Sequence, residues 1–191
     1  MKKAEGKAVI GEVRFCYVHV WEKQNISGKE GDEKYSCCCM FTKNDKKIIE
    51  QIKQAIKEAL KRGARQYGEK WLKQATENKE NIVKDGNEKF PDNPEFADMY
   101  FINAYAKTAP GVVDRKRQPI LDKDEFYSGC YGYVSITIYP FNNPTNKGIS
   151  VGLNHVMKTK DGEFLGGRSS AEDDFSDIDL GDEDDDLSDL F

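Results

Sequence analysis

Residues 131–141 read YGYVSITIYPF, and the chemical character of the side chains alternates from one position to the next. Because successive side chains of a strand point to opposite faces, this pattern predicts a β-strand with two unlike faces. The aliphatic face, which we expect to be core, holds Val134, Ile136 and Ile138. The other face would carry Tyr131, Tyr133, Ser135, Thr137, Tyr139 and Phe141. A segment of this kind requires a sheet or barrel whose non-aliphatic surface is rich in aromatic rings.

Four further segments have the composition of strands, namely residues 7–22, 35–42, 99–108 and 147–159. In the first of these, Cys16, Val18 and Val20 are expected on one face and Phe15, Tyr17, His19 and Trp21 on the other. In residues 99–107 the two faces would be Ile102, Ala104 and Ala106 against Phe101, Asn103, Tyr105 and Lys107. Three of the five predicted strands therefore offer rings on the face away from their aliphatic side chains.

The hydrophobic period changes after Asn44, where apolar side chains begin to recur every three or four residues among many lysines. This period predicts an amphipathic helix with Asn44 or Asp45 as its N-cap. Gly63 and Gly68 weaken its continuation, and residues 74–94 are polar enough to be read mainly as loop. The predicted fold class is therefore mainly β, with five strands and one inserted helix.

The charge of the chain is divided unevenly along its length. Of the 34 acidic residues, 11 lie in residues 169–191, where no Lys or Arg occurs. Residues 1–168 therefore carry 29 basic against 23 acidic residues, a net charge of +6, although the whole chain carries −5. We expect a basic folded domain over residues 1–168 and a disordered acidic tail over 169–191, because so polar a segment cannot offset its ordering entropy. The basic domain suggests a polyanionic partner.

The five cysteines are odd in number, and Cys37, Cys38 and Cys39 are consecutive. This favours reduced thiols over a disulfide framework. On a strand, Cys37 and Cys39 would share one face while Cys38 lies on the other. A zinc site with His19 and His155 is a weaker alternative, because no CxxC pair is present. We expect buried core thiols and neither a metal nor a cofactor.

No stretch of 18 or more apolar residues occurs, and the sequence does not begin with a basic stretch, an apolar stretch and a cleavage site. We therefore expect no membrane association and a cytoplasmic location.

Aromatic rings bordered by basic residues are typical of proteins that bind single-stranded nucleic acid, because a base can stack on an aromatic ring whatever its identity. The candidate stacking residues are Tyr17, Trp21, Tyr105, Tyr131, Tyr133 and Tyr139, and the candidate phosphate-binding residues are Lys107, Arg115, Lys116 and Arg117. The alternative is that these rings fill a second packing layer and that the basic loop is only solvated.

Catalytic signals are weak. The sequence lacks the glycine-rich phosphate-binding motifs, the GxSxG motif and the HExxH motif. Asp122, Asp124 and Glu125 could hold Mg²⁺ in a nuclease, but Asp122 stands where a helix N-cap is expected. We therefore expect no enzymatic activity, with a metal-dependent nuclease as the weakest alternative.

Several segments resemble a family of phage and prophage single-stranded DNA-binding proteins: RFCYVHVWE (14–22), PGVVD (110–114), QPILDKDEFYSGCYG (118–132) and KGISVGLNHVMKTKDGEFLGGRSSAEDDF (147–175). The resemblance implies an OB-fold-like barrel that coats single-stranded DNA in phage replication or recombination, in the cytoplasm of the bacterial host. One departure is that the helix follows only two apparent strands rather than three. Either the first strand bends near Gly11 and counts twice, or the barrel is elaborated.

The tail ends in GDEDDDLSDLF, which resembles the acidic tails of other phage and bacterial single-stranded DNA-binding proteins. We expect it to compete with DNA and to recruit replication or recombination proteins through Asp182, Glu183, Asp184, Asp185, Asp186, Leu187, Asp189, Leu190 and Phe191. The alternative is an interaction protein whose tail mimics DNA and whose body is a scaffold. The sequence does not determine the oligomeric state, of which a dimer is one option.

Overall fold

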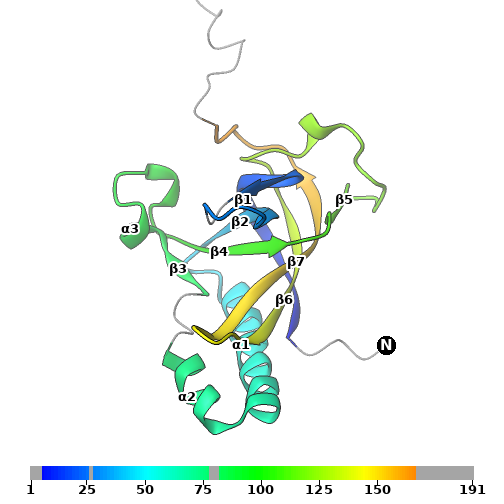
Figure 1. Ribbon diagram of the computed structural model, residues 1–191. Coiled ribbons are helices and arrows are strands. Elements are labelled where there is room, and N and C mark those ends of the chain that lie inside the picture. Colours follow the sequence, from blue (N-terminus) through cyan, green and yellow to red (C-terminus); the bar gives the residue numbers. More distant parts are fainter. Residues whose placement is uncertain (1–5, 26–27, 78–81, 167–191) are drawn as a thin grey trace, which may run out of the picture.

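Five strands form a closed barrel in the computed structural model, which describes residues 6–25, 28–77 and 82–166 (Figure 1). The barrel strands are β1 (Lys7–Asn25), β2 (Glu33–Thr42), β4 (Met99–Ala106), β6 (Tyr131–Asn142) and β7 (Lys147–Lys160). The short strands β3 (Lys84–Asp85) and β5 (Gly111–Val113) extend the sheet beside β4 and β7. Around the barrel the order is β1-β2-β4-β7-β6 and back to β1, with β4 and β7 parallel and the other barrel pairs antiparallel. This is the order of an OB-fold, and the predicted five-stranded barrel is confirmed.

Strand β1 takes part in both halves of the barrel, because it pairs with β6 near its start and with β2 further on. Its register shifts three times, between Ile10 and Val13, between Cys16 and His19, and between His19 and Gln24. Each shift changes which residues face inward, so the buried side chains are Ala8 and Ile10, then Val13 and Phe15, then Val20. The prediction that Phe15 shares a face with Tyr17 was therefore wrong, because Tyr17 sits in the second irregularity with a φ of 46°.

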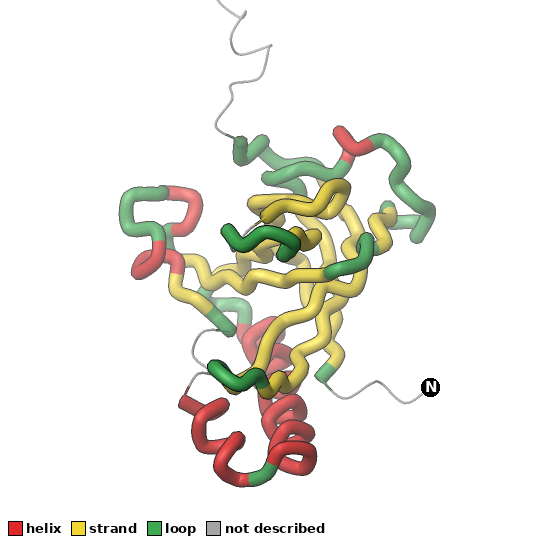
Figure 2. The backbone as a smooth tube through the Cα atoms, in the orientation of Figure 1, coloured by secondary structure: helices red, strands yellow, loops and turns green. Residues whose placement is uncertain are grey.

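The helices lie at one end of the barrel, where α1 (Lys46–Tyr67) and α2 (Glu69–Glu77) pack side by side (Figures 1 and 2). They connect the second and third barrel strands, whereas a standard OB-fold has its helix between the third and fourth. Of the two explanations offered from the sequence, the structure therefore favours an elaborated barrel in which β1 is a single strand. The Asp45 side chain accepts a hydrogen bond from the amide of Ile48 at 3.0 Å, which confirms one of the two predicted N-caps. The inward face of α1 buries Ile48, Ile52, Ala55, Ala59 and Gly63 in the core.

The sequence suggested that residues 74–94 are mainly loop. This prediction was wrong, because most of the described residues in this range belong to helices or a strand. Helix α2 continues to Glu77, and β3, α3 (Gly86–Lys89) and a 3₁₀ helix (Pro94–Phe96) follow. The helix continues because Trp71 and Ala75 are buried on one face of it, and the Trp71 indole donates a hydrogen bond of 2.8 Å to the carbonyl of Phe141. No helix in the described part of the chain is long and apolar enough to span a membrane.

A second apolar cluster lies on the outer face of β1, β2 and β4, separate from the barrel core. Its buried members are Cys16, Cys38, Met40, Phe96 and Phe101. Phe96 comes from residues 86–98, a segment that covers this face of the sheet and is seen at the left of Figure 1. Cys37 and Cys39 point into the barrel core while Cys38 lies in the second cluster, as predicted, and all five thiols are free. Among the described residues no group of three His, Cys, Asp or Glu is placed to hold a metal ion.

Candidate nucleic-acid interface

A row of outward-facing positions runs around the barrel across every barrel strand. Strand pairing places Lys7 opposite Thr137, Thr137 opposite Gly152, Gly152 opposite Tyr105, Tyr105 opposite Ser36, and Ser36 opposite His19. These six residues form what we call the outer row. Each has a buried core residue next to it on its own strand, so its own side faces away from the core. With neighbouring strands about 4.8 Å apart, five steps give a path of about 24 Å perpendicular to the strands.

A shallow groove of about 230 Å³ occupies the part of the outer row that crosses β1, β2 and β4. Its lining residues are Tyr17, His19, Ser36, Cys37, Cys38, Asn103 and Tyr105. Tyr17 is 54% exposed, and its ring lies 6.4 Å from the ring centres of both Phe90 and Phe96. Residues 86–98 thus lie beside the Tyr17 ring, which stays more than half exposed at the edge of the groove.

Burial acts on two ionisable groups of this groove. Desolvation raises the pKa of Tyr105, so its phenol stays neutral at physiological pH. Desolvation also lowers the pKa of His19 below 6.5, so the imidazole is neutral at pH 7 and gains its charge only in mildly acidic solution. The floor of the groove therefore offers rings and hydrogen-bonding groups, and carries no fixed negative charge.

Beyond Tyr105 the outer row continues over a glycine. A Cβ atom placed on Gly152 would lie 3.3 Å from Cε1 of Tyr139, so the Tyr139 ring lies close to the bare backbone of β7. Tyr139 itself is 41% exposed. Next to it, the Asn154 amide donates a hydrogen bond of 3.0 Å to the hydroxyl of Thr137. Tyr105 and Tyr139 are therefore on either side of a flat, small-residue section of the barrel surface.

Lys34 and Lys107 lie near one end of the groove, beyond the last residue pair of β2 and β4. Tyr35 is paired with Ala106, so Lys34 and Lys107 occupy neighbouring positions just beyond this pair. Lys34 forms an ion pair of 2.8 Å with Asp32, whereas Lys107 is exposed. Lys107, a predicted phosphate-binding residue, is thus two residues from Tyr105, directly after the end of β4.

Two further lysines lie over aromatic rings of β2 and β4. Lys84 places its Nζ 5.8 Å from the centre of the Phe101 ring, and Lys23 places its Nζ 5.7 Å from that of Tyr35. Phe101 belongs to the second apolar cluster, so Lys84 borders the face that also carries the groove. Lysine side chains thus lie close to aromatic rings of these two strands. Binding of a polyanion with planar bases requires such a combination of cations and rings.

The predicted basic loop of Arg115, Lys116 and Arg117 lies beyond β5 and is fully exposed. One carboxylate oxygen of Asp114 accepts hydrogen bonds of 2.8 Å from the amides of Lys116 and Gln118, which gives the turn a defined shape. Since β5 pairs with β7 next to the point where β4 does, the loop extends from this part of the barrel, but it contributes no residue to the groove.

The remaining predicted rings lie away from the groove. Trp21 is half-buried, packs against the core and donates a hydrogen bond of 3.2 Å to the carbonyl of Phe126. Tyr133 packs closely over Gly11, where an added Cβ would meet the ring at 2.5 Å. Tyr131 lies between two cations, with Arg14 5.7 Å and Lys160 4.6 Å from its ring centre. The predicted tail residues, from Asp182 to Phe191, lie outside the described residues.

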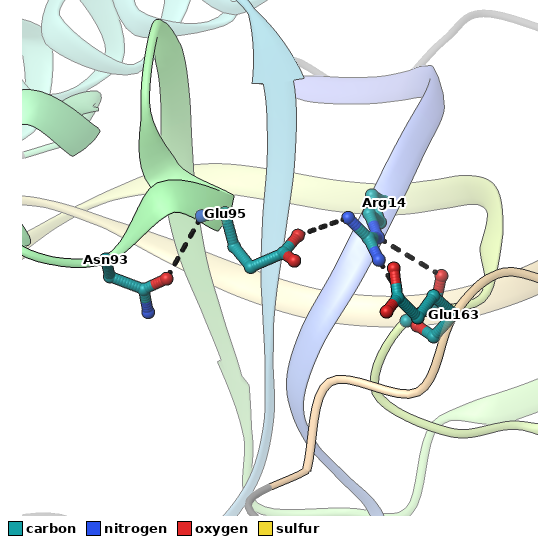
Figure 3. A network of polar contacts seen from close by, with 5 residues as sticks. Arg14, Asn93, Glu95 and Glu163 are labelled. Carbon is teal, nitrogen blue, oxygen red and sulfur yellow. Dashed lines mark hydrogen bonds and ion pairs between the residues drawn. The ribbon is translucent and has the colours of Figure 1, made fainter. Parts of the chain in front are cut away.

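Sequence reasoning missed several residues of this face, including Ser36, Asn103 and Gly152 in or beside the groove. It also missed a polar network that holds the surrounding segments together (Figure 3). Arg14 forms an ion pair with Glu95 and donates a hydrogen bond of 3.2 Å to the carbonyl of Glu163. The network ties residues 86–98 and the segment after β7 to β1. No local pattern indicates it, because its members are distant in sequence.

Asp122, the alternative metal ligand, has a structural role. Its carboxylate accepts a hydrogen bond of 3.0 Å from the amide of Asp124 and caps the 3₁₀ helix Lys123–Glu125. This confirms the expected capping.

Comparisons with known proteins place the chain in a family. The family described as Enterobacter phage Enc34, ssDNA-binding protein, matches residues 6–188. Protein p50 of Acyrthosiphon pisum secondary endosymbiont phage 1 is 29% identical over 188 residues, which cover 93% of this chain and 96% of p50.

Two solved structures are similar to this chain. The single-stranded DNA-binding protein of bacteriophage Enc34 in complex with ssDNA has a TM-score of 0.67 and 26% identity, with 87% of this chain and 97% of that chain covered. The single-stranded DNA-binding protein gp2.5 of bacteriophage T7 has a TM-score of 0.52 and 13% identity, with 88% and 99% covered, and shares the fold.

Proposed function

This chain belongs to the family of the Enterobacter phage Enc34 ssDNA-binding protein, and we propose that it binds single-stranded DNA along the outer row. The observation that carries the proposal is the continuity of the row, which crosses all five barrel strands with Tyr17, Tyr105 and Tyr139 in or beside it. At the rise of a duplex strand, about 3.4 Å per nucleotide, a path of about 24 Å spans about seven nucleotides. This lies within the range of about 4 to 16 nucleotides bound by one OB-fold.

Binding combines stacking with contacts to phosphate. Bases stack on Tyr17, Tyr105 and Tyr139, and each stack contributes about 1 to 3 kcal/mol with little dependence on sequence. Lys107 and the neighbouring lysines contact the phosphates at one end of the row, and the exposed loop of residues 115–117 contacts them beyond β5. Trp21 and Tyr133 support the barrel in this arrangement, and Tyr131 binds DNA only where the strand passes Arg14 and Lys160.

The biological role that fits this site is the coating of single-stranded DNA during phage replication or recombination, in the cytoplasm of the bacterial host. The protein acts by binding, without catalysis and without a metal or cofactor. The capping role of Asp122 supports this over the nuclease alternative. Residues 1–168 form the binding domain, and residues 169–191 form the acidic tail.

The tail competes with DNA for the basic body and recruits replication or recombination proteins. Its support is the charge division of the sequence, with all 11 tail acids unaccompanied by Lys or Arg. Deleting residues 176–191 separates this from the scaffold alternative. The shortened chain binds DNA at least as tightly as the full chain if the body is the binding domain, and it loses all activity if the tail is the only active part.

A gel-shift titration of the full chain on single- and double-stranded DNA of equal length tests the function. We expect tighter binding to the single strand. Across a salt series, the logarithm of the affinity should fall with the logarithm of salt concentration, with a slope of about −0.7 for each phosphate contacted. Affinity that does not depend on salt, or a preference for duplex, would rule out the proposed mode of binding.

A further inference from the structure

Most of the positive charge of residues 1–168 lies on the two helices and away from the Tyr17–Tyr105 groove. Residues 46–77 hold nine basic and four acidic residues, a net charge of +5 out of the +6 of residues 1–168. The described residues that line the groove include no Lys or Arg, and residues 86–98 beside it hold four acids and one lysine. Because a charge acts over about 8 Å at physiological salt, the helix charges help to bind DNA only where a strand passes over them.

Three lysines form a row on the outward face of α1, which we call the α1 stripe. Lys53, Lys57 and Lys61 are exposed and follow one another at a spacing of four residues, so they lie along one side of the helix over about 12 Å. None of them forms an ion pair with a residue that the structure describes. None has an acidic residue four positions away, so the repulsion between neighbouring lysines is not offset within the stripe.

Helix α1 lies directly beside the start of β1. The amide of Gly6 donates a hydrogen bond of 2.9 Å to the Glu58 carboxylate, and the Gln51 side chain donates one of 3.2 Å to the carbonyl of Val9. Three residues of extended chain separate Gly6 from Val9, about 10 Å, and seven residues of helix separate Gln51 from Glu58, about 10.5 Å. The matching lengths show that α1 runs alongside the start of β1 and antiparallel to it (Figure 1).

The outer row leads onto this helix. The row reaches β1 at Lys7, which lies between the two residues that are hydrogen-bonded to α1. On one side of Lys7 is β6, while β2 pairs with β1 from Arg14 onward, so α1 takes the place of a strand on the other side. Lys61 follows Glu58 by three residues and therefore adjoins it on the helix surface. The surface next to Lys7 along the row is thus the side of α1 that leads to the stripe.

We propose that the α1 stripe is a second phosphate-binding site, onto which single-stranded DNA passes when it leaves the outer row at Lys7. This inference rests on the DNA binding proposed for the outer row. The stripe contains lysines and no aromatic ring, so it binds the sugar-phosphate backbone and leaves the bases unstacked on the protein. At about 3.4 Å per nucleotide, a stripe of about 12 Å adds about three nucleotides to the seven of the outer row.

The length of the DNA distinguishes the two sites. Anisotropy titrations use labelled oligothymidines of about 6 nucleotides, which the outer row alone covers, and of about 12 nucleotides, which also reach the stripe. The double variant Lys57→Gln, Lys61→Gln should bind the longer DNA about 3- to 30-fold more weakly than the parent and the shorter DNA within about two-fold. For the longer DNA, the salt slope should become smaller in magnitude by about 1.4, because two phosphate contacts are lost.

The double variant Lys70→Gln, Lys73→Gln is the matched control, because it removes the same charge from two exposed lysines of α2. It should bind both lengths like the parent. Gln is about as good a helix former as Lys, and circular dichroism checks that both variants are folded. An equal loss of affinity in the two variants would mean that overall charge attracts the DNA and would overturn the proposal. A loss as large for the shorter DNA as for the longer would overturn it too.

Tyr105→Leu, measured on the same two oligonucleotides, separates this inference from the function on which it rests. If Tyr105→Leu weakens binding of both lengths while Lys57→Gln, Lys61→Gln binds the longer DNA like the parent, the outer row stands and the α1 stripe is wrong. If Tyr105→Leu weakens neither, the outer row fails, and the continuation onto α1 fails with it.

Discussion

Tyr105 of β4 lies directly opposite Gly152 of β7, in the parallel pairing that closes the barrel. The same glycine is in contact distance of the Tyr139 ring on β6. The seam that closes the sheet into a barrel therefore has Tyr105 on one side of a glycine and the Tyr139 ring next to that glycine on the other side. The pairing of Tyr105 with Gly152 therefore both closes the barrel and joins the two parts of the outer row.

Replacing Tyr105 by Leu should weaken binding to single-stranded DNA by about 5- to 150-fold, the equivalent of one lost base stack of about 1 to 3 kcal/mol. Leu retains apolar packing at this half-buried position, so the fold should persist. Fluorescence anisotropy with a labelled oligothymidine measures the change. Tyr67→Leu, on α1 and remote from the row, is the matched control and should bind like the parent. Equal affinities for all three proteins would remove Tyr105 from the site.

Replacing Gly152 by Val should also weaken DNA binding while the barrel remains folded. The first added carbon would lie 3.3 Å from the Tyr139 ring and 3.4 Å from the carbonyl oxygen of Thr137, so the ring must shift and the path over β7 becomes blocked. We expect a loss of about ten-fold in the same anisotropy assay. Ser150→Val, at the partner position of Tyr139, adds similar bulk one step away and serves as the comparison. If Ser150→Val costs more affinity than Gly152→Val, the strand does not cross β7 at the glycine.

Affinity for DNA should rise as the pH falls through a range below the ordinary pKa of histidine. Burial lowers the pKa of His19, so the imidazole is neutral at pH 7, and the proton it gains in acid adds a positive charge beside the bound phosphates. One such contact corresponds to a gain of about two- to five-fold. The rise should disappear in His19→Gln and persist in His155→Gln, the chain's other histidine. A rise that vanishes only in His155→Gln would assign the effect to β7.

Gly63→Ala should lower the free energy of unfolding by about 1 to 3 kcal/mol, because the added carbon would meet the Trp71 ring at 2.0 Å. This loss occurs although Ala favours a helix interior over Gly by about 1 kcal/mol. Urea denaturation followed by circular dichroism gives the value. Gln66→Ala, exposed on the same helix, is expected to be neutral or slightly stabilising. A Gly63→Ala variant as stable as the parent would show that α2 does not pack on α1 in this way.

The strands and the first helix could be predicted from the sequence because their signals are local. Alternation over residues 131–141 gave β6 to within one residue, and the spacing of isoleucines gave α1 with Asp45 as its cap. The continuation into α2 was left open, because Gly68 suggested a break while Trp71 could carry the apolar stripe onwards, and the structure shows that the packing of Trp71 bridges the break. Local periodicity thus decides the elements, and tertiary packing decides where they end.

The faces of β1 and the composition of the candidate site could not be predicted in the same way. A single irregularity at Tyr17 reverses the inward and outward positions, and no residue pattern marks it. The candidate rings were chosen strand by strand, but which of them share a surface depends on the register between strands that are distant in sequence. Tyr17 and Tyr105 meet in one groove, whereas Tyr131 and Tyr133 lie on another part of the barrel.

The most direct test of the account is to map where single-stranded DNA touches the protein. The full chain is bound to an oligonucleotide containing 5-iodouracil, irradiated and digested, and the crosslinked peptides are identified by mass spectrometry. We predict crosslinks to peptides that carry Tyr17, Tyr105 and Tyr139. Crosslinks confined to α1, or to Tyr131 and Tyr133 with none in the Tyr17–Tyr105 groove, would contradict binding along the outer row.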